Sequence, residues 1–590
     1  TMPAAWRLSV ATLSQQLPEA MELLRCCAFF GPEAIPRDLF RRVARDTDTR
    51  VSDLLADPIL LARAIRELGR FALVRIDGRA ILLHRLIQAL LREELSSAEQ
   101  ASYRHEVHLI LAAGAPKDPY DSRLWPRYAE LVAHVSSEAT DLAHCQDSGP
   151  RALAVDIVRY LNRSGDQASA RSFAEPLIRQ WVQDSGPDDP SVLAMQRVLG
   201  DALRELGLYA ESFDLSRGTL ARARQVLGER DPLTLALANS SAADLRARGD
   251  FAAARELDEQ SLEQHEKVLG PENPQTLRVM NNLALDHGLT SSYQRARELH
   301  ERTYLLQSEA RTGVSVPEVL NSWNGLARAV RLCGYFTEAR DVGEDAYDYG
   351  VEQLGPEHYL TLRTGKDLSI ALRRSGATAH DYALELSQTV FDRFRRLAPG
   401  RPDTLAAAIS LINIRRVMGQ PDEVVELAES TEDEYAKVYG PDHPYSHGCR
   451  ANLALLKRLA GDLDEARRLN QAALDGLDAR LTRNHDYSLT VAVNLATNLA
   501  VLGETAEARA LTEDSLIRLR HLMGEDDTLT LGCAVNLVAD LRASGCDEQA
   551  EALLADTLSR YQKTLGRDYP DAIAAVEGRR LDFDFDPPPI

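Results

Sequence analysis

A column of short polar side chains recurs along most of this sequence and offers the clearest candidate chemistry. It contains Asn452, Asn494 and Asn536, which follow one another at intervals of 42 residues. A carboxamide carries a donor and an acceptor, so it can pair with the N–H and C=O groups of an extended peptide. The same amides can instead hydrogen-bond within or between helices. The peptide-binding candidates are Ser240, Asn282, Asn452, Asn494 and Asn536, with Asp244, Asp286, Asn498 and Asp540 one helical turn later on the same face.

A glycine column nine residues downstream provides the register of this pattern. Its intervals are all 42 or 43 residues, and Ser291 fills the one gap. Glycine suits a helix end because the left-handed conformation is costly for residues with a Cβ. The turn column consists of Gly165, Gly207, Gly249, Ser291, Gly334, Gly376, Gly419, Gly461, Gly503 and Gly545.

Two further columns and a boundary marker predict that each period is a pair of helices. Small residues such as Ala466 and Ala508 follow the turn, and apolar residues such as Leu453 and Leu495 precede it. Segments such as LGPENPQTL end one helix with glycine and begin the next with Asn-Pro. The pattern predicts ten helix-turn-helix units over residues 146–566 and a last helix near Pro570–Arg580. No unit can bury its apolar stripe alone, so stacking would form a superhelix with a concave face.

These columns resemble the tetratricopeptide repeat, in the 42-residue variety of kinesin light chains and many bacterial signalling proteins. The resemblance implies an all-α, right-handed superhelical solenoid over residues 146–580, with the first helix of each pair lining a concave groove. It also implies that Asn282, Asn452, Asn494 and Asn536 match asparagines that bind the backbone of an extended peptide.

Residues 1–104 predict a different, winged-helix-like α+β domain. Helical spacing covers Pro18–Phe30, then Ile35 to about Arg45, then Pro58–Leu68. Two short strands, Phe71–Ile76 and Arg79–Leu83, flank the Asp77-Gly78 turn, and a helix returns at His84–Leu95.

This domain resembles the winged-helix region that follows the nucleotide-binding core of NB-ARC (STAND-type) signalling ATPases. The resemblance is carried by Trp6, Leu8-Ser9, Leu23-Leu24, Cys27–Phe30, Ile35-Pro36, His84–Leu86 and Gln88. Residues 105–145 resemble the helical connector of those proteins, through Pro119, Trp125–Tyr128 and Leu131. No GxxxxGK[ST] phosphate loop occurs here, and Thr364–Asp367 lacks the required glycine and hydroxyl. We therefore expect the chain to be the C-terminal part of a larger protein whose ATPase core lies outside it.

The last ten residues, 581–590, read LDFDFDPPPI and predict an extended acidic tail. Such an end resembles the C-termini of tetratricopeptide proteins encoded with actinobacterial FxSxx-COOH peptide-maturation systems. The tail is itself an extended peptide that could occupy the groove. Repulsion from Asp244, Asp286 and Asp540 argues against that arrangement.

Composition excludes several functions. A net charge of −21 argues against a nucleic-acid-binding solenoid and is compatible with a basic partner, although solubility alone explains it. No stretch approaches the 18 apolar residues of a membrane span. Seven scattered cysteines indicate a reducing cytoplasm rather than a disulfide framework. We expect no cofactor or metal: His84 fits a packing or capping role, and Pro444 interrupts the His443/His447 pair.

These observations predict a non-catalytic sensor and scaffold that binds a protein or extended peptide and relays binding to an ATPase core. One alternative is a transcription regulator that uses the winged helix on DNA. That helix offers only Arg63 and Arg66, and residues 1–104 are close to neutral. A defence-type sensor of foreign protein is a second alternative. No catalytic motif stands in a context that favours an enzyme.

Overall fold

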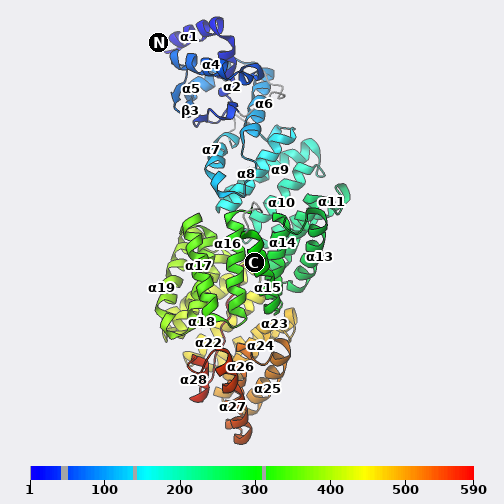
Figure 1. The fold of residues 1–590 in the computed structure, drawn as a ribbon, viewed down its shortest axis with the longest axis vertical. Coiled ribbons are helices and arrows are strands. Elements are labelled where there is room, and N and C mark those ends of the chain that lie inside the picture. Colours follow the sequence, from blue (N-terminus) through cyan, green and yellow to red (C-terminus); the bar gives the residue numbers. More distant parts are fainter. Residues whose placement is uncertain (1, 42–50, 137–141, 309–313) are drawn as a thin grey trace. The chain divides into compact units, whose positions relative to one another are not determined.

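The computed structural model describes residues 2–41, 51–136, 142–308 and 314–590. Its contacts separate two units, residues 1–202 with 221–226, and residues 203–220 with 227–590. Figure 1 labels the elements of both. In the described part of the chain, no helix combines the length and apolarity needed to cross a membrane.

The first unit begins with short helices around a small antiparallel sheet. Strands β1 (Ile35–Pro36), β3 (Ala80–Leu82) and β2 (Arg75–Asp77) pair in that order, with Ile81 opposite both Ile35 and Ile76. The sequence predicted a helix starting at Ile35-Pro36. That prediction was wrong, because the pair extends along β3 and only the 3₁₀ turn η1 (Leu39–Arg41) follows within the described residues. The winged-helix assignment stays a prediction. The helices are α1 (Met2–Gln16), α2 (Pro18–Cys27), α3 (Ser52–Ala56), α4 (Pro58–Arg70), α5 (Arg85–Glu93) and α6 (Ser97–Gly114).

His84 begins α5 as its N-cap, where its Nδ1 accepts a hydrogen bond from the Leu86 N–H at 3.2 Å. The side chain therefore caps a helix, as expected from its isolation from other metal-binding residues. The connector follows as η2 (Ser122–Leu124), α7 (Trp125–Val135) and η3 (Leu142–His144).

Ten helix pairs follow in the described part of the chain, and they are tetratricopeptide repeats. The first helices are α8 (Ser148–Ser164), α10 (Pro190–Glu205), α12 (Pro232–Ala247), α14 (Pro274–Leu289), α16 (Val316–Leu332), α18 (Tyr359–Ser375), α20 (Pro402–Val417), α22 (Pro444–Leu459), α24 (Asp486–Val501) and α26 (Thr528–Ala543). The second helices are α9 (Gln167–Ser185), α11 (Tyr209–Val226), α13 (Phe251–Leu269), α15 (Tyr293–Ser308), α17 (Phe336–Leu354), α19 (His380–Leu397, after η4, Ala377–Ala379), α21 (Val425–Tyr439, after η5, Pro421–Val424), α23 (Leu463–Leu481), α25 (Thr505–Leu522) and α27 (Asp547–Thr564).

The turn column has the positive φ that favours glycine, although Gly376, with φ 128° and ψ 167°, is extended and not left-handed helical. All its glycines have positive φ, and Ser291, in the same place, has φ 61°. The helix starts are also as predicted: Asp231, Asn273 and Asp527 each cap a first helix through the side chain. The small residues that follow each turn pack tightly, since Ala466, Ala508 and Ala550 are fully buried.

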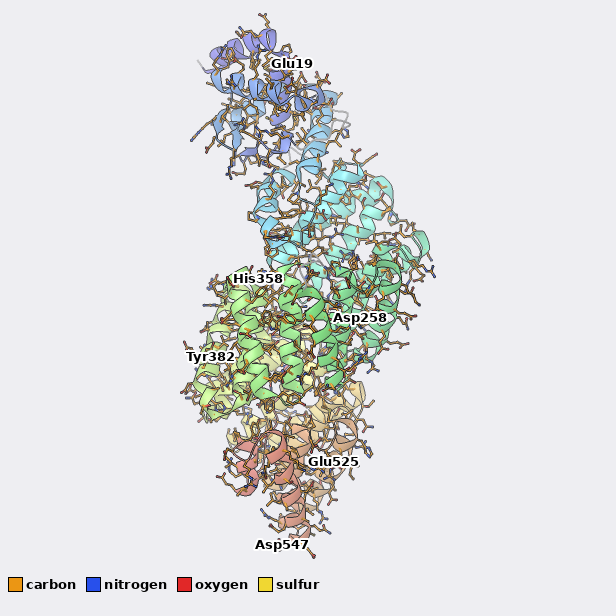
Figure 2. The ribbon with its side chains drawn as sticks, viewed as in Figure 1. Glu19, Asp258, His358, Tyr382, Glu525 and Asp547 are labelled. Atoms are coloured by element: carbon orange, nitrogen blue, oxygen red, sulfur yellow. The ribbon has the colours of Figure 1, made fainter. Side chains whose placement is uncertain are left out.

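The second unit closes on itself, because the end of one repeat contacts the start of another about 195 residues later. Asp486 accepts a hydrogen bond from Ser291 Oγ at 2.6 Å, and His485 Nε2 lies 2.9 Å from the Leu289 carbonyl. A Cβ on Gly249 would meet Pro444 Cδ at under 3.0 Å. Figure 2 shows the side chains that fill this unit, with Asp258 labelled on α13 and His358 at the start of α18.

The chain ends inside this unit. Helix α28 (Pro570–Val576) is shorter than the predicted Pro570–Arg580, because Gly578 has φ 71° and the backbone then extends. In Figure 1 the C-terminus is drawn away from α27 and α28, and Ile590 packs on the apolar cluster that contains Leu405, Tyr435 and Tyr445. The last residues therefore return along the repeats.

Candidate functional site

The extended tail, residues 579–590, lies across the first helices α26, α24, α22, α20 and α18 in turn. Three asparagines each hold one tail residue by both backbone groups. Asn536 bonds to Leu581 (2.7 and 2.9 Å), Asn494 to Phe583 (3.1 and 2.8 Å), and Asn452 to Phe585 (2.9 and 2.8 Å). In each pair the tail N–H donates to Oδ1, and Nδ2 donates to the tail C=O.

The spacing of these three asparagine–tail contacts follows from the period of the extended chain and the period of the repeats. An extended chain advances about 6.6 Å for every two residues, and successive repeats each present one carboxamide. Alternate tail residues therefore meet successive repeats. Asn494 and Asn536 are fully buried and Asn452 is 3% exposed, so an unpaired amide would be costly here.

The alternate phenylalanines of the tail enter recesses where the first helices carry glycine. Phe583 lies on Gly532 and Phe585 lies on Gly448, and a Cβ at either glycine would sit under 3.0 Å from the ring. Tyr445 and Tyr487 meet the Phe585 ring edge to face at 5.6 and 5.1 Å. Both phenylalanines are buried, so the site also selects side chains.

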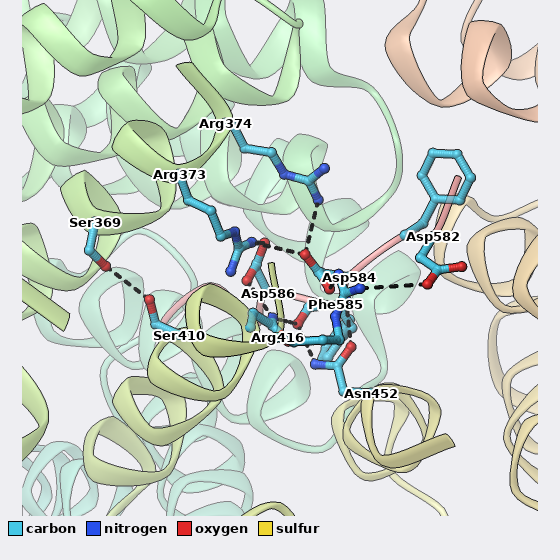
Figure 3. Close-up of polar contacts among 12 residues, drawn as sticks. Ser369, Arg373, Arg374, Ser410, Arg416, Asn452, Asp582, Asp584, Phe585 and Asp586 are labelled. Carbon is cyan, nitrogen blue, oxygen red and sulfur yellow. Dashed lines mark hydrogen bonds and ion pairs between the residues drawn. The ribbon is translucent and has the colours of Figure 1, made fainter. Parts of the chain in front are cut away.

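The three tail aspartates that alternate with these phenylalanines, Asp582, Asp584 and Asp586, face arginines (Figure 3). Asp586 bonds to Arg373 at 2.6 Å, and Asp584 bonds to Arg416 at 2.5 Å with Arg373 at 3.5 Å. Arg374 lies 3.9 Å from Asp584. Asp582 pairs with Arg458 and lies 3.6 Å from Arg416.

Burial and charge act in opposite directions on these groups. Burial alone would raise the pKa of Asp586, but Arg373, Arg374 and Arg331 together hold that pKa well below its ordinary value. Burial would lower the pKa of Arg416, yet Asp584 and Asp582 raise it above the usual value. The charged forms of Asp586 and Arg416 are thus both stabilised by their partners in the groove.

The final residues are held by backbone contacts and packing. Lys366 Nζ donates to the Pro587 carbonyl at 3.0 Å, and the Tyr445 hydroxyl donates to the Pro588 carbonyl at 3.1 Å. Asn413 Nδ2 donates to the Phe585 carbonyl and to Asp586 Oδ1. Ile590 packs on the apolar cluster that contains Tyr435 and Phe251.

The other predicted site residues have partners within the repeats or, for Asp540, in a tail side chain. Asn282 Nδ2 donates to Asn239 Oδ1 at 2.8 Å, the inter-helix alternative. Ser240 is buried, and its carbonyl accepts from Arg204 at 3.5 Å. Asn498 Oδ1 accepts from Arg458 at 2.8 Å.

The predicted aspartates are each neutralised by an arginine. Asp244 accepts from Arg204 at 2.8 Å and from Ser212 Oγ, and Asp286 accepts from Arg246 at 3.0 Å. Asp540 pairs with Arg580 of the tail itself. The expected repulsion of an acidic tail by these carboxylates was therefore wrong, because it counted the aspartates and omitted their partners.

The groove arginines were not among the predicted site residues, although a periodic signal for them exists. Three residues before the turn position, the chain has arginine in seven of ten repeats: Arg204, Arg246, Arg331, Arg373, Arg416, Arg458 and Arg542. These positions lie six residues after the polar column, almost two helical turns along the same helices. Lys366, in the segment that lacks a phosphate loop, holds a tail carbonyl.

Comparisons with known proteins agree with the repeat assignment. Tetratricopeptide repeat models match residues 233–305 and residues 192–233 and 530–571. A domain of unknown function, DUF7779, matches residues 11–100. No curated protein sequence matches the chain.

Several solved structures resemble parts of the chain. A Podospora anserina putative kinesin light chain repeat protein shares 23% identity over 35% of this chain and 98% of its own (TM-score 0.30). A Rap protein complexed with competence and sporulation factor shares 13% identity over 69% of this chain and 100% of its own (TM-score 0.44). A STAND protein with a tetratricopeptide repeat sensor from Pyrococcus horikoshii shares 12% identity over 93% of this chain and 64% of its own (TM-score 0.31). The repeat models, and not these distant structures, identify the helix pairs as tetratricopeptide repeats, which form protein-interaction scaffolds.

Proposed function

We propose that this chain is a non-catalytic peptide-binding sensor whose ligand lies where the tail lies now. The observation that carries the proposal is the set of Asn452, Asn494 and Asn536, each of which holds both backbone groups of one tail residue. Those contacts do not depend on the bound side chain, so they suit any extended peptide in the same register.

The charge of the groove favours an acidic ligand. The net charge of −21 is compatible with a basic partner, and that expectation stays untested for the rest of the surface. In the groove, Arg373, Arg416 and Arg458 face the bound chain, whereas Asp244 and Asp286 are already paired with arginine. A basic peptide would leave those arginines unpaired and add repulsion.

The role in a larger signalling protein is a further part of this proposal. The resemblance of residues 1–145 to the winged helix and connector of NB-ARC-type ATPases supports it. In a longer chain that carries such a core, ligand capture would change nucleotide hydrolysis, and Asn494→Ala would remove that response.

A peptide-display selection tests the binding function. The bait is the full chain with Phe583→Ala and Phe585→Ala, here called the tail-weakened chain, in which the groove itself is unchanged. We expect enriched peptides to be retained by this bait and lost when Asn452, Asn494 and Asn536 are also changed to Ala. The matched control is Asn282→Ala, which removes an amide of the same column outside the tail contacts. Retention by the triple-alanine chain, with unchanged circular dichroism, would contradict the proposal.

A further inference from the structure

The tail fits the groove incompletely. Beside residues 583–586 lies a cavity of about 150 Å³, lined in part by Arg331, Arg374, Leu332 and Phe336. Arg331 is 8% exposed, and its Nε has no hydrogen-bond partner among the residues that the structure describes. Burial lowers the pKa of this guanidinium, although Asp586 and Asp367 act in the opposite direction. A buried cation beside unfilled space indicates that another ligand can gain contacts that the tail does not make.

The tail nevertheless has an advantage from its attachment. It follows α28 directly, and a short tether acts like a ligand at roughly millimolar concentration. A free peptide at micromolar concentration must then bind about 1,000-fold more tightly than the untethered tail sequence. Unused contacts at Arg331 are one source of such a gain.

The side-chain contacts define what a competitor must look like. Gly448 and Gly532 leave room for aromatic rings to approach the helix backbone, at two tail positions separated by one residue. Arg373, Arg416 and Arg458 require acidic side chains at the positions between and beside them. The sign of the charge and the two-residue alternation are both set by the fold.

Resting on the proposed function, we propose that the natural ligand is an extended peptide with alternating acidic and aromatic residues, which displaces the tail. It shares the Asp-Phe-Asp-Phe-Asp pattern of residues 582–586, and it places a longer acidic side chain toward Arg331. The tail is then a built-in competitor that sets the ligand concentration needed for a response.

Fluorescence anisotropy with a labelled synthetic peptide of residues 579–590 tests this inference. We expect weak binding to the native chain, whose own tail competes, and binding at least tenfold tighter to the tail-weakened chain. A peptide with all three aspartates changed to asparagine should lose at least tenfold in affinity. A peptide with Asp586→Glu should gain affinity for the tail-weakened chain, and that gain should disappear when Arg331→Met is added.

The outcomes separate the inference from the proposed function. Equal affinity of the aspartate and asparagine peptides would overturn the acidic ligand while leaving backbone capture intact. Failure of every peptide to bind a folded tail-weakened chain would overturn both. No effect of Arg331→Met on the glutamate peptide would remove the role of the cavity. If circular dichroism shows that the tail-weakened chain does not fold, a chain with Asp582, Asp584 and Asp586 changed to Asn replaces it. The expected results are the same.

Discussion

The arginine column meets two different partners along the second unit. In the upstream repeats, Arg204 and Arg246 pair with Asp244 and Asp286, which lie on the next first helix. In two of the downstream repeats, the position equivalent to those aspartates is apolar, Ile414 after Arg373 and Leu456 after Arg416. These arginines pair with the tail instead.

This difference in arginine partners explains how a uniform repeat produces a binding site in only some of its copies. A carboxylate on the following repeat satisfies the arginine internally, and its absence leaves a cation facing the groove. The exception at the end of the array follows the same logic: Ala500 replaces the arginine that would pair with Asp540, and Arg580 of the tail takes that place.

Removing the internal cation should have the largest effect. Arg246 lies 2.7 Å from Asp258 and 3.0 Å from Asp286, and all three side chains are at most 3% exposed. Arg246→Met should cost about 3–5 kcal/mol, since it removes the cation that the buried Asp258 and Asp286 share. Urea unfolding followed by circular dichroism measures this loss. Adding Asp258→Asn and Asp286→Asn should recover most of it, and an unchanged unfolding midpoint in Arg246→Met would show that the cluster is not charged.

Removing one groove amide should have the next largest effect, on the tail alone. Asn494→Ala leaves the Phe583 N–H and C=O without their partner, which costs about 1–3 kcal/mol for buried groups. Hydrogen exchange at the Phe583 amide should accelerate accordingly, about 5- to 150-fold. Asn282→Ala, from the upstream repeats, should leave that exchange rate unchanged. Equal acceleration in both variants would mean that the column acts on solenoid stability and not on the tail.

Acid should loosen the tail through Asp586. Its pKa is held below the ordinary 3.8 in the docked state, so the docked state binds fewer protons than the free tail. Docking is therefore at full strength above about pH 4 and weakens as the pH falls through the docked-state pKa, by at most tenfold per pH unit. Fluorine NMR of fluorophenylalanine at position 585 follows this transition, and Asp586→Asn should flatten it.

The internal cluster should respond to pH in the opposite direction. Burial raises the pKa of Asp258 well above 3.8, with Arg246 acting against it, so the folded state retains a proton that the unfolded chain releases. The contribution of Asp258 to stability is thus present at low pH and lost as the pH rises through its folded-state pKa. If release of the tail and loss of solenoid stability had the same acidic midpoint, the two pH responses would not be opposite, and this prediction would be wrong.

Supplying the missing arginine should have the smallest effect. Ala500→Arg places a guanidinium where the upstream repeats have one, next to Asp540, in competition with Arg580. We expect docking of the start of the tail to weaken by about 0.5–1 kcal/mol, the size of one partly exposed pair. Hydrogen exchange at Leu581 reports it, with Ala500→Gln as the uncharged control of similar length. Faster exchange with glutamine as well would indicate crowding instead of competition.

The sequence by itself determined the repeat. Glycine at 42- or 43-residue intervals, alanine and leucine columns and proline-led helix starts are local signals, and each depends on backbone conformation or burial within one or two neighbouring helices. The same period placed Asn452, Asn494 and Asn536 on one face, and the aspartates and prolines of the tail predicted an extended end.

Only the tertiary structure decided what that face holds. Whether Asp540 repels the tail depends on Arg580, and whether Asp286 is available depends on Arg246, and both pairings form between residues 40 positions apart. The return of the tail also depends on closure of the superhelix, where Ser291 meets Asp486 across about 195 residues. Net charge and composition sum over the chain, whereas binding depends on which charges remain unpaired after folding.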